Sequence, residues 1–196
     1  MILLVHIMQN KNIIFELYRD QRTVFSLQEI AMIIGEPDFD RLKRRINYYV
    51  SRNKLKNLRR GIYAKEGYDV EELACKIFKP SYISLEKVLQ KNGVVFQYNP
   101  NITMVSYLSR SIEIDNHNFV YRKIKNEVLC DATGINMNNG ISMADPERAF
   151  LDTLYLNKTY YFDSLGSLNK ETIYKMLPIY HSGQLAKRVQ KILTNA

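Results

Sequence analysis

The sequence predicts an α+β protein with two domains, and three observations lead to this prediction. The chain has 196 residues, a length that allows one or two domains. Hydrophobic residues make up 46% of the chain and aromatic residues 11%, which is enough to build a core. Helical and strand-like patterns both occur, and their character changes after residue 66. We therefore expect an N-terminal domain over residues 1–66 and a C-terminal domain over residues 67–196.

The basic residues are concentrated in one short stretch. The net charge is +8, from 28 Lys or Arg and 20 Asp or Glu residues. Residues 41–65 hold ten of the basic residues and no acid, so 18 basic and 20 acidic residues remain elsewhere, a net charge of −2. A local basic patch on a nearly neutral body favours an anionic partner. Apolar residues interrupt the stretch at regular spacing, which indicates a folded surface and not a charged tail.

The first elements follow from spacing and capping residues. A helix is predicted within residues 2–18, where apolar residues recur at helical spacing. These residues are Ile7, Ile13, Ile14, Leu17 and Tyr18. Residues 23–25 favour a short strand. A second helix should begin at Ser26, an N-cap with Glu29 at the capping-box position, and should end at Gly35.

A third helix is predicted from about Asp38, followed by a hairpin. Its apolar residues form one stripe and are Phe39, Leu42, Ile46, Tyr49 and Val50. Residues 54–60 and 61–65 are typical of two short strands around a tight turn. Their packed side chains should be Leu55, Leu58, Ile62 and Tyr63. Helix, strand, helix, turn, helix and hairpin is the order of a winged helix-turn-helix, so we expect this fold for the N-terminal domain.

In that fold the helix after the turn enters the major groove of double-stranded DNA and the hairpin lies along the backbone. Helical geometry places Arg41, Arg44, Asn47, Tyr48 and Ser51 opposite the apolar stripe, with Lys43, Arg45 and Arg52 at its flanks. The hairpin carries Lys54, Lys56, Arg59 and Arg60. Arginine can bind guanine edges or phosphates, Asn47 can pair with adenine, and hydroxyl groups can donate to phosphates.

These twelve side chains are the candidate DNA-binding residues. We assign phosphate contacts to those of the hairpin, where Gly61 supplies a backbone conformation unsuited to larger residues. Asp40 is an acid on the same helical face and counts against DNA binding there. Alternatively, its carboxylate bonds the amides of the first turn. A charged surface without any ligand stays open as the alternative.

The second domain is predicted to mix helices and strands. Residues 69–78 should form a helix that Pro80 ends, and residues 81–93 a helix capped by Ser84. Strand-like segments follow at residues 94–98, 102–107, 111–114 and 118–124. A helix buried on all sides should begin with Asp145 as N-cap and Pro146 at its first position. The chain is helical again from residue 170, with a break at Pro178.

Three segments together resemble the AbiEi-type antitoxins of type IV toxin–antitoxin systems. They are "RRGIYAK" at residues 59–65, "KPSYISLEKVLQKNGVV" at 79–95 and "ISMADPERAFLDTLYL" at 141–156. In the last segment the matching residues are Ala144, Pro146, Glu147, Arg148, Ala149, Leu151 and Asp152.

The resemblance implies a repressor that binds repeated sites at its own promoter, as a monomer or with weak self-association on DNA. It also implies a nucleotidyltransferase-like toxin as partner, counteracted without a stable complex, and a C-terminal domain that carries the antitoxic activity.

A metal-dependent DNA-processing enzyme with a winged-helix targeting module is the alternative function. Its candidate carboxylates are Glu113, Asp115, Asp131, Glu147 and Asp152. Local roles explain two of them, because Glu147 lies in a first helical turn and Asp152 lies four residues after Arg148. The three histidines are far apart, and Cys75 and Cys130 are typical of buried thiols. We therefore expect no catalytic residue, no metal and no cofactor.

The start of the chain is apolar but short. Residues 1–8 cannot span a bilayer and lack the features of a signal peptide, and no other segment is long and apolar enough. We expect a cytoplasmic protein without a membrane partner. Whether translation starts at Met1 or Met8 stays open.

Overall fold

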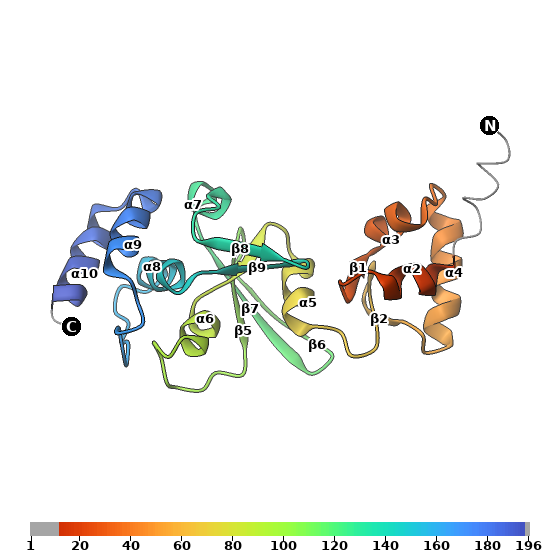
Figure 1. Cartoon of the computed structure of the whole chain (residues 1–196), viewed down its shortest axis with the longest axis horizontal. Coiled ribbons are helices and arrows are strands. Elements are labelled where there is room, and N and C mark those ends of the chain that lie inside the picture. The colour runs from red at the N-terminus through yellow and green to blue at the C-terminus, as the bar shows by residue number, and fades with distance from the viewer. Residues whose placement is uncertain (1–11, 195–196) are drawn as a thin grey trace. The chain divides into compact units, whose positions relative to one another are not determined.

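The computed structural model describes residues 12–194, and the chain divides into two compact units, residues 1–77 and 78–196 (Figure 1). Helices and two separate sheets build these units, so the predicted α+β class is confirmed. The part of the first expected helix before residue 12, which includes Ile7, lies outside the described residues. Met1 and Met8, the two candidate start residues, also lie outside them.

Between residues 12 and 77, the first unit contains every element expected for residues 12–66 and one helix more. Its elements are α2 (Ile13–Arg19), β1 (Val24–Ser26), α3 (Leu27–Ile34), α4 (Phe39–Ser51), β2 (Lys56–Arg59), β3 (Ile62–Ala64) and α5 (Val70–Ile77). The three strands form an antiparallel sheet in the order β1-β3-β2. Helices α2, α3 and α4 share one core with the hairpin through residues such as Leu17, Ile30, Leu42, Ile46 and Leu55.

The helix starts in this unit are explained by their caps. The Ser26 hydroxyl accepts a hydrogen bond from the Glu29 amide at 3.2 Å, and Glu29 Oε2 accepts one from the Ser26 amide at 2.7 Å. This is the capping box that the sequence predicts. Asp38 caps α4 by accepting from two first-turn amides at 3.0 Å. Gly35 ends α3 in the left-handed conformation, with φ of 73°.

One member of the predicted apolar stripe of α4 is not buried. Leu42 and Ile46 are fully buried, and Tyr49 and Val50 pack against the same core. Phe39, by contrast, is 41% exposed. It is the first residue of the helix, so its side chain lies outside the part of α4 that the core covers.

Helix α5 packs on the first unit, although the sequence placed residues 67–77 in the second domain. Glu72 Oε2 accepts hydrogen bonds from the amide of Thr23 at 2.6 Å and from its hydroxyl at 2.8 Å. Lys76 Nζ lies 2.7 Å from Glu29 Oε1. Leu73 between them is fully buried. These contacts with β1 and α3 move the division from residue 66 to Ile77.

The Glu29–Lys76 pair should make the first unit sensitive to acid. Burial raises the pKa of Glu29, but the hydrogen bonds from Lys76 and Ser26 outweigh it and hold the pKa below the usual 4.5. A lowered pKa in the folded state stabilises above pH 4.5, and this contribution is lost as the pH falls through the folded value. We expect Glu29→Gln to cost about 2 kcal/mol at pH 7 and to reduce the loss of stability toward pH 3.

This prediction can be checked by urea unfolding, followed through amide exchange in residues 27–34. Glu16→Gln is the matched control, because the Glu16–Arg19 pair is long, at 3.9 Å, and its arginine is mostly exposed. It should change stability by no more than about 0.5 kcal/mol. Equal effects of both substitutions, or an unchanged acid profile in Glu29→Gln, would contradict the assignment.

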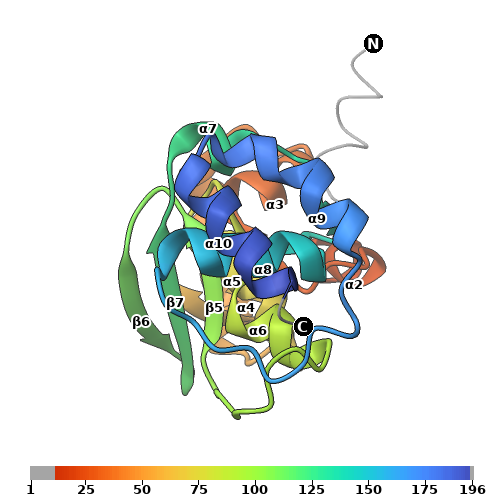
Figure 2. The ribbon, with the colours of Figure 1, turned by 90° about the vertical axis from the view of Figure 1, so that its left-hand side faces the viewer.

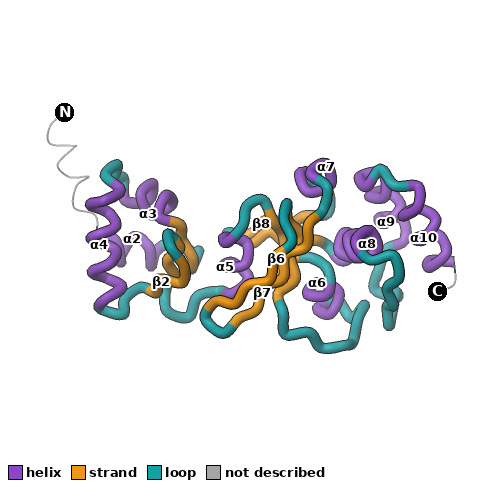
Figure 3. Tube along the Cα trace, turned by 180° about the vertical axis from the view of Figure 1, so that it is seen from behind, coloured by secondary structure: helices purple, strands orange, loops and turns teal. Residues whose placement is uncertain are grey.

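The second unit is built on a six-stranded mixed sheet. Its strands are β4 (Ser81–Ile83), β5 (Ile102–Ser106), β6 (Arg110–Ile114), β7 (His117–Lys123), β8 (Ile135–Asn138) and β9 (Ile141–Ala144). They follow the order β6-β7-β5-β4-β9-β8, shown as orange strands in Figure 3. The pairs β5/β7 and β4/β9 are parallel, and the others are antiparallel.

Helices cover this sheet in layers. They are α6 (Glu86–Lys91), α7 (Asn126–Cys130), α8 (Pro146–Leu156), α9 (Lys170–Met176), the 3₁₀ helix η1 (Leu177–Tyr180) and α10 (Gly183–Thr194). Helix α8 contacts β9 on one side and α9 and α10 on the other, so it lies between the sheet and these two helices (Figures 1 and 2). Residues 148–154 of α8 are all buried, as the sequence predicts. Asp145 is its N-cap and Pro146 its first residue.

Two predictions for residues 81–98 are wrong. Ser84 does not cap a helix, because it follows strand β4 and its buried hydroxyl donates to Asp152 Oδ2 at 2.7 Å. Residues 94–98 form no strand. Their first carbonyl, of Val94, accepts instead from the Asp163 amide at 3.0 Å, and the Phe96 amide donates to the Asp163 carboxylate at 2.8 Å.

The cysteines differ from each other. Cys75 is buried in α5 as predicted, whereas Cys130 at the end of the short helix α7 is exposed. Between residues 12 and 194, none of the helices has both the length and the apolar character that crossing a bilayer requires.

Candidate nucleic-acid interface

All candidate DNA-binding residues lie in the first unit, on α4, on the β2–β3 hairpin and, for Arg52 and Lys54, in the segment that joins them. On α4 the positions Arg41, Arg44, Asn47, Tyr48 and Ser51 are exposed, while Leu42 and Ile46 on the opposite side are fully buried. Lys43 and Arg52 are exposed as well, and Arg45 is half-buried. Helical spacing alone accounts for this division, since residues three and four apart share one face.

Glu36 organises the first half of this face. Its carboxylate Oε2 lies 3.6 Å from Arg41 Nε and 3.6 Å from Arg45 Nη1, and its side chain is only 11% exposed. The basic stretch therefore has a balancing acid, which lies before it in the chain. Glu36 orients these two guanidinium groups, whereas Arg44 on the same helix is exposed.

Asp40 does not bond the first-turn amides, which Asp38 occupies instead. The Asp40 carboxylate lies in solvent and accepts from Lys43 Nζ at 3.4 Å. Both partners of this pair are largely exposed, so it contributes little to stability. It nevertheless lowers the positive charge at the N-terminal end of the α4 face.

The second half of the α4 face is aromatic and basic. The Arg52 guanidinium carbon lies 5.6 Å from the centre of the Tyr48 ring, and Tyr48 meets Tyr49 edge to face at 5.5 Å. Ser51 Oγ donates to the Tyr48 carbonyl at 2.8 Å. Its proton is thereby used inside the helix, so Ser51 is a poorer donor to phosphate than the sequence predicts.

The hairpin is held to the rest of the unit at its turn. Gly61 has φ of 79°, which favours glycine, and its carbonyl accepts from the Leu27 amide at 3.0 Å. This bond joins the turn to the start of α3. The candidate residues here are all exposed and are Lys54, Lys56, Arg59 and Arg60. A second row of cations is thus presented by a backbone with a defined position.

Lys65 does not belong to the basic surface. Its Nζ donates to the Asp20 carbonyl at 2.6 Å and lies 5.6 Å and 5.7 Å from the ring centres of Tyr18 and Phe25. Burial lowers the pKa of Lys65 despite the nearby charges of Asp20 and Glu72. Charge counting in the sequence could not detect this, because Lys65 differs from its basic neighbours only in its place after β3.

The carboxylates proposed for the alternative function, a metal-dependent enzyme, differ in burial and in hydrogen-bond partners. Asp152 is fully buried, Glu147 accepts from the Asn169 amide at 2.8 Å, and Asp131 accepts from the Thr133 amide at 2.8 Å. Glu113 and Asp115 are exposed on β6 and in the turn after it. Among residues 12–194, no three His, Cys, Asp or Glu side chains gather as a metal ion would require.

The geometry of the first unit can serve one chemical purpose well. Its exposed cations are side chains that can bind phosphates, and arginine and asparagine, such as the exposed Arg44 and Asn47, can also bind base edges. A scan against protein-family models and a search of curated proteins give no match.

Proposed function

We propose that this protein is a transcriptional regulator that binds double-stranded DNA through a winged helix-turn-helix in its first unit. The observation that carries the proposal is the basic, exposed face of α4, which lies opposite the fully buried Leu42 and Ile46. The element order α2–β1–α3–α4–β2–β3 and the sheet β1-β3-β2 support the fold assignment.

In this proposal α4 lies in the major groove and the hairpin follows the phosphate backbone. Arg44 and Asn47 read base edges, and Glu36 holds Arg41 and Arg45 for the phosphates beside the groove. The exposed lysines and arginines of residues 54–60 contact the neighbouring phosphates.

We further propose that the protein represses its own operon and acts as an antitoxin through its second unit. The resemblance to AbiEi-type antitoxins supports this part. It implies repeated sites at the promoter and a nucleotidyltransferase-like toxin that the second unit counteracts. One of the three segments that carry the resemblance includes α8, where Arg148 and Asp152 are fully buried. These two residues therefore maintain the fold of the second unit, and the antitoxic surface must lie on exposed residues elsewhere.

The test of DNA binding separates residues that contact base edges from residues that contact phosphates. Arg44→Ala should lose about 1–3 kcal/mol on the promoter of its own operon and little on random duplex DNA. Arg60→Ala should weaken both complexes similarly and reduce the salt slope by about one unit. Fluorescence anisotropy on both duplexes, from 50 to 200 mM salt, measures this.

Arg19→Ala is the matched control, because Arg19 is an exposed arginine of α2 outside the candidate surface. It should bind like the unchanged protein. Equal losses for Arg44→Ala and Arg60→Ala on both DNAs would show that α4 is not the recognition helix. Cleavage of either duplex after addition of magnesium would favour the enzyme instead.

A further inference from the structure

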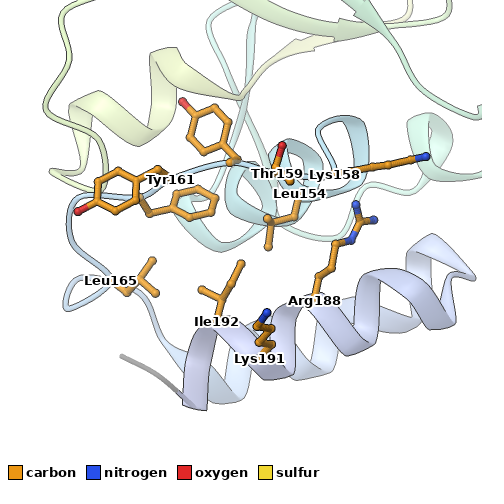
Figure 4. Close-up of a pocket in the computed structure, with 10 residues that line it drawn as sticks. Leu154, Lys158, Thr159, Tyr161, Leu165, Arg188, Lys191 and Ile192 are labelled. Carbon is orange, nitrogen blue, oxygen red and sulfur yellow. The ribbon is translucent and has the colours of Figure 1, made fainter.

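The second unit contains a pocket that DNA binding by the first unit does not use. It has a volume of about 700 Å³ and lies between the end of α8, residues 158–165 and α10 (Figure 4). Small-molecule sites usually enclose about 300–1,000 Å³. Leu154, Leu165 and Ile192 provide its apolar walls.

The charged residues that line the pocket are all cations. They are Lys158, Arg188 and Lys191, and the lining contains no Asp or Glu. Arg188, Lys191 and Ile192 share one face of α10, beside the buried stripe of Leu185 and Val189. Arg188 Nε is buried and has no hydrogen-bond partner among the described residues. Such a group favours an anion that supplies the missing acceptor.

Aromatic rings occupy the remaining part of the lining. The ring centres of Tyr160 and Phe162 lie 4.9 Å apart, and the ring centre of Phe150 lies 4.8 Å from that of Phe162. Tyr161 is 79% exposed, and so its ring is accessible to a ligand. Figure 4 shows Tyr161 and Leu165 at one end of the pocket and the side chains of Lys158 and Arg188 at the other.

The pocket is therefore polarised. Burial, followed by the nearby charges of Glu86 and Asp163, raises the pKa of Tyr160 to about 12. Tyr160 consequently keeps its proton and can donate it. A fitting ligand carries negative charge at the Lys158 and Arg188 end and a neutral, flat group with hydrogen-bond acceptors at the aromatic end.

We propose that this pocket binds a nucleotide, with its phosphate at Lys158, Arg188 and Lys191 and its base against the tyrosines. Arginine matches the geometry of phosphate oxygens, and bases stack on aromatic rings regardless of their sequence. A free nucleotide and the terminal nucleotide of a single strand share this chemistry.

Isothermal titration of the full chain with AMP, adenosine and inorganic phosphate tests the proposal. AMP should bind at least about tenfold more tightly than either fragment. Lys158→Gln and Arg188→Gln should weaken AMP binding by about tenfold, and Tyr161→Ala by about fivefold or more. Lys187 is an exposed lysine of α10 outside the pocket lining, so Lys187→Gln should change the affinity for AMP by less than about twofold.

A hexamer of adenosine ribonucleotides with a terminal phosphate distinguishes the two sources. It is titrated into a protein variant that carries Arg44→Ala, Lys54→Ala and Arg60→Ala. Tighter binding of the hexamer than of AMP assigns a strand end, and equal or weaker binding assigns the free nucleotide. Absence of AMP binding, or phosphate binding as tightly as AMP, would overturn the proposal. Lys158 lies in an exposed loop. If Arg188→Gln lowers the melting temperature, Lys158→Gln therefore provides the test of anion binding in its place.

Discussion

Replacing Asp152 with alanine is expected to unfold the second unit, at a cost of about 3–5 kcal/mol. Asp152 and Arg148 are both 0% exposed, with Arg148 Nε 3.4 Å from Asp152 Oδ1. The substitution leaves the arginine charged and buried without its counter-charge. Such a group costs far more than the loss of one hydrogen bond.

Several hydrogen bonds would be lost with the same carboxylate. Ser84 Oγ donates to Asp152 at 2.7 Å, and the hydroxyls of Tyr180 and Tyr82 donate at 2.7 Å and 3.2 Å. Burial and the charge of Asp152 raise the pKa of both tyrosines, so they remain protonated donors. Burial lowers the pKa of Arg148, but its interactions with Tyr180 and Asp152 raise this pKa by a larger amount. The guanidinium group therefore remains charged.

A second ion pair with the same spacing provides the control. Glu171 and Lys175 also lie four residues apart, at 2.8 Å, but their side chains are 76% and 73% exposed. Glu171→Ala should therefore change stability by no more than about 0.5 kcal/mol. The double variant Arg148→Met with Asp152→Leu should recover much of the loss, because no buried charge remains. Thermal and urea unfolding measure both effects, and similar costs for Asp152→Ala and Glu171→Ala would refute the prediction.

The second large effect is the loss of DNA binding without loss of antitoxicity. Arg44→Ala, Lys54→Ala and Arg60→Ala together should weaken promoter binding at least about a hundredfold and reduce the salt slope by about two to three units. The three residues are exposed, so each substitution should cost no more than about 0.5 kcal/mol of stability. Arg41 and Arg45 are less suitable, because their removal leaves Glu36 half-buried without its partners.

The measurement is growth rescue in cells that express the toxin from an unrelated promoter. The triple variant should still protect these cells, whereas Asp152→Ala should not, because its second unit is unfolded. Melting curves of the purified variants confirm which of them fold. A folded triple variant that fails to protect would show that antitoxicity depends on the DNA-binding surface.

The sequence by itself determined the features that depend on residues a few positions apart. The capping box of Ser26 and Glu29, the end of α3 at Gly35 and the start of α4 after Asp38 are local, and each is present as predicted. The division of α4 into a buried and a basic face also follows from spacing alone. Its only exception, Phe39, lies at the end of the helix, where neighbouring elements decide burial.

Only the tertiary structure decided which distant groups meet. Lys76 meets Glu29 across 47 positions, and this contact assigns α5 to the first unit. Ser84 meets Asp152 across 68 positions, which turns an expected helix cap into part of a buried polar cluster. Lys65 is likewise removed from the basic surface by Asp20. In each case a polar group that leaves water must find a partner, and the partner is chosen by the packing of elements rather than by neighbouring residues.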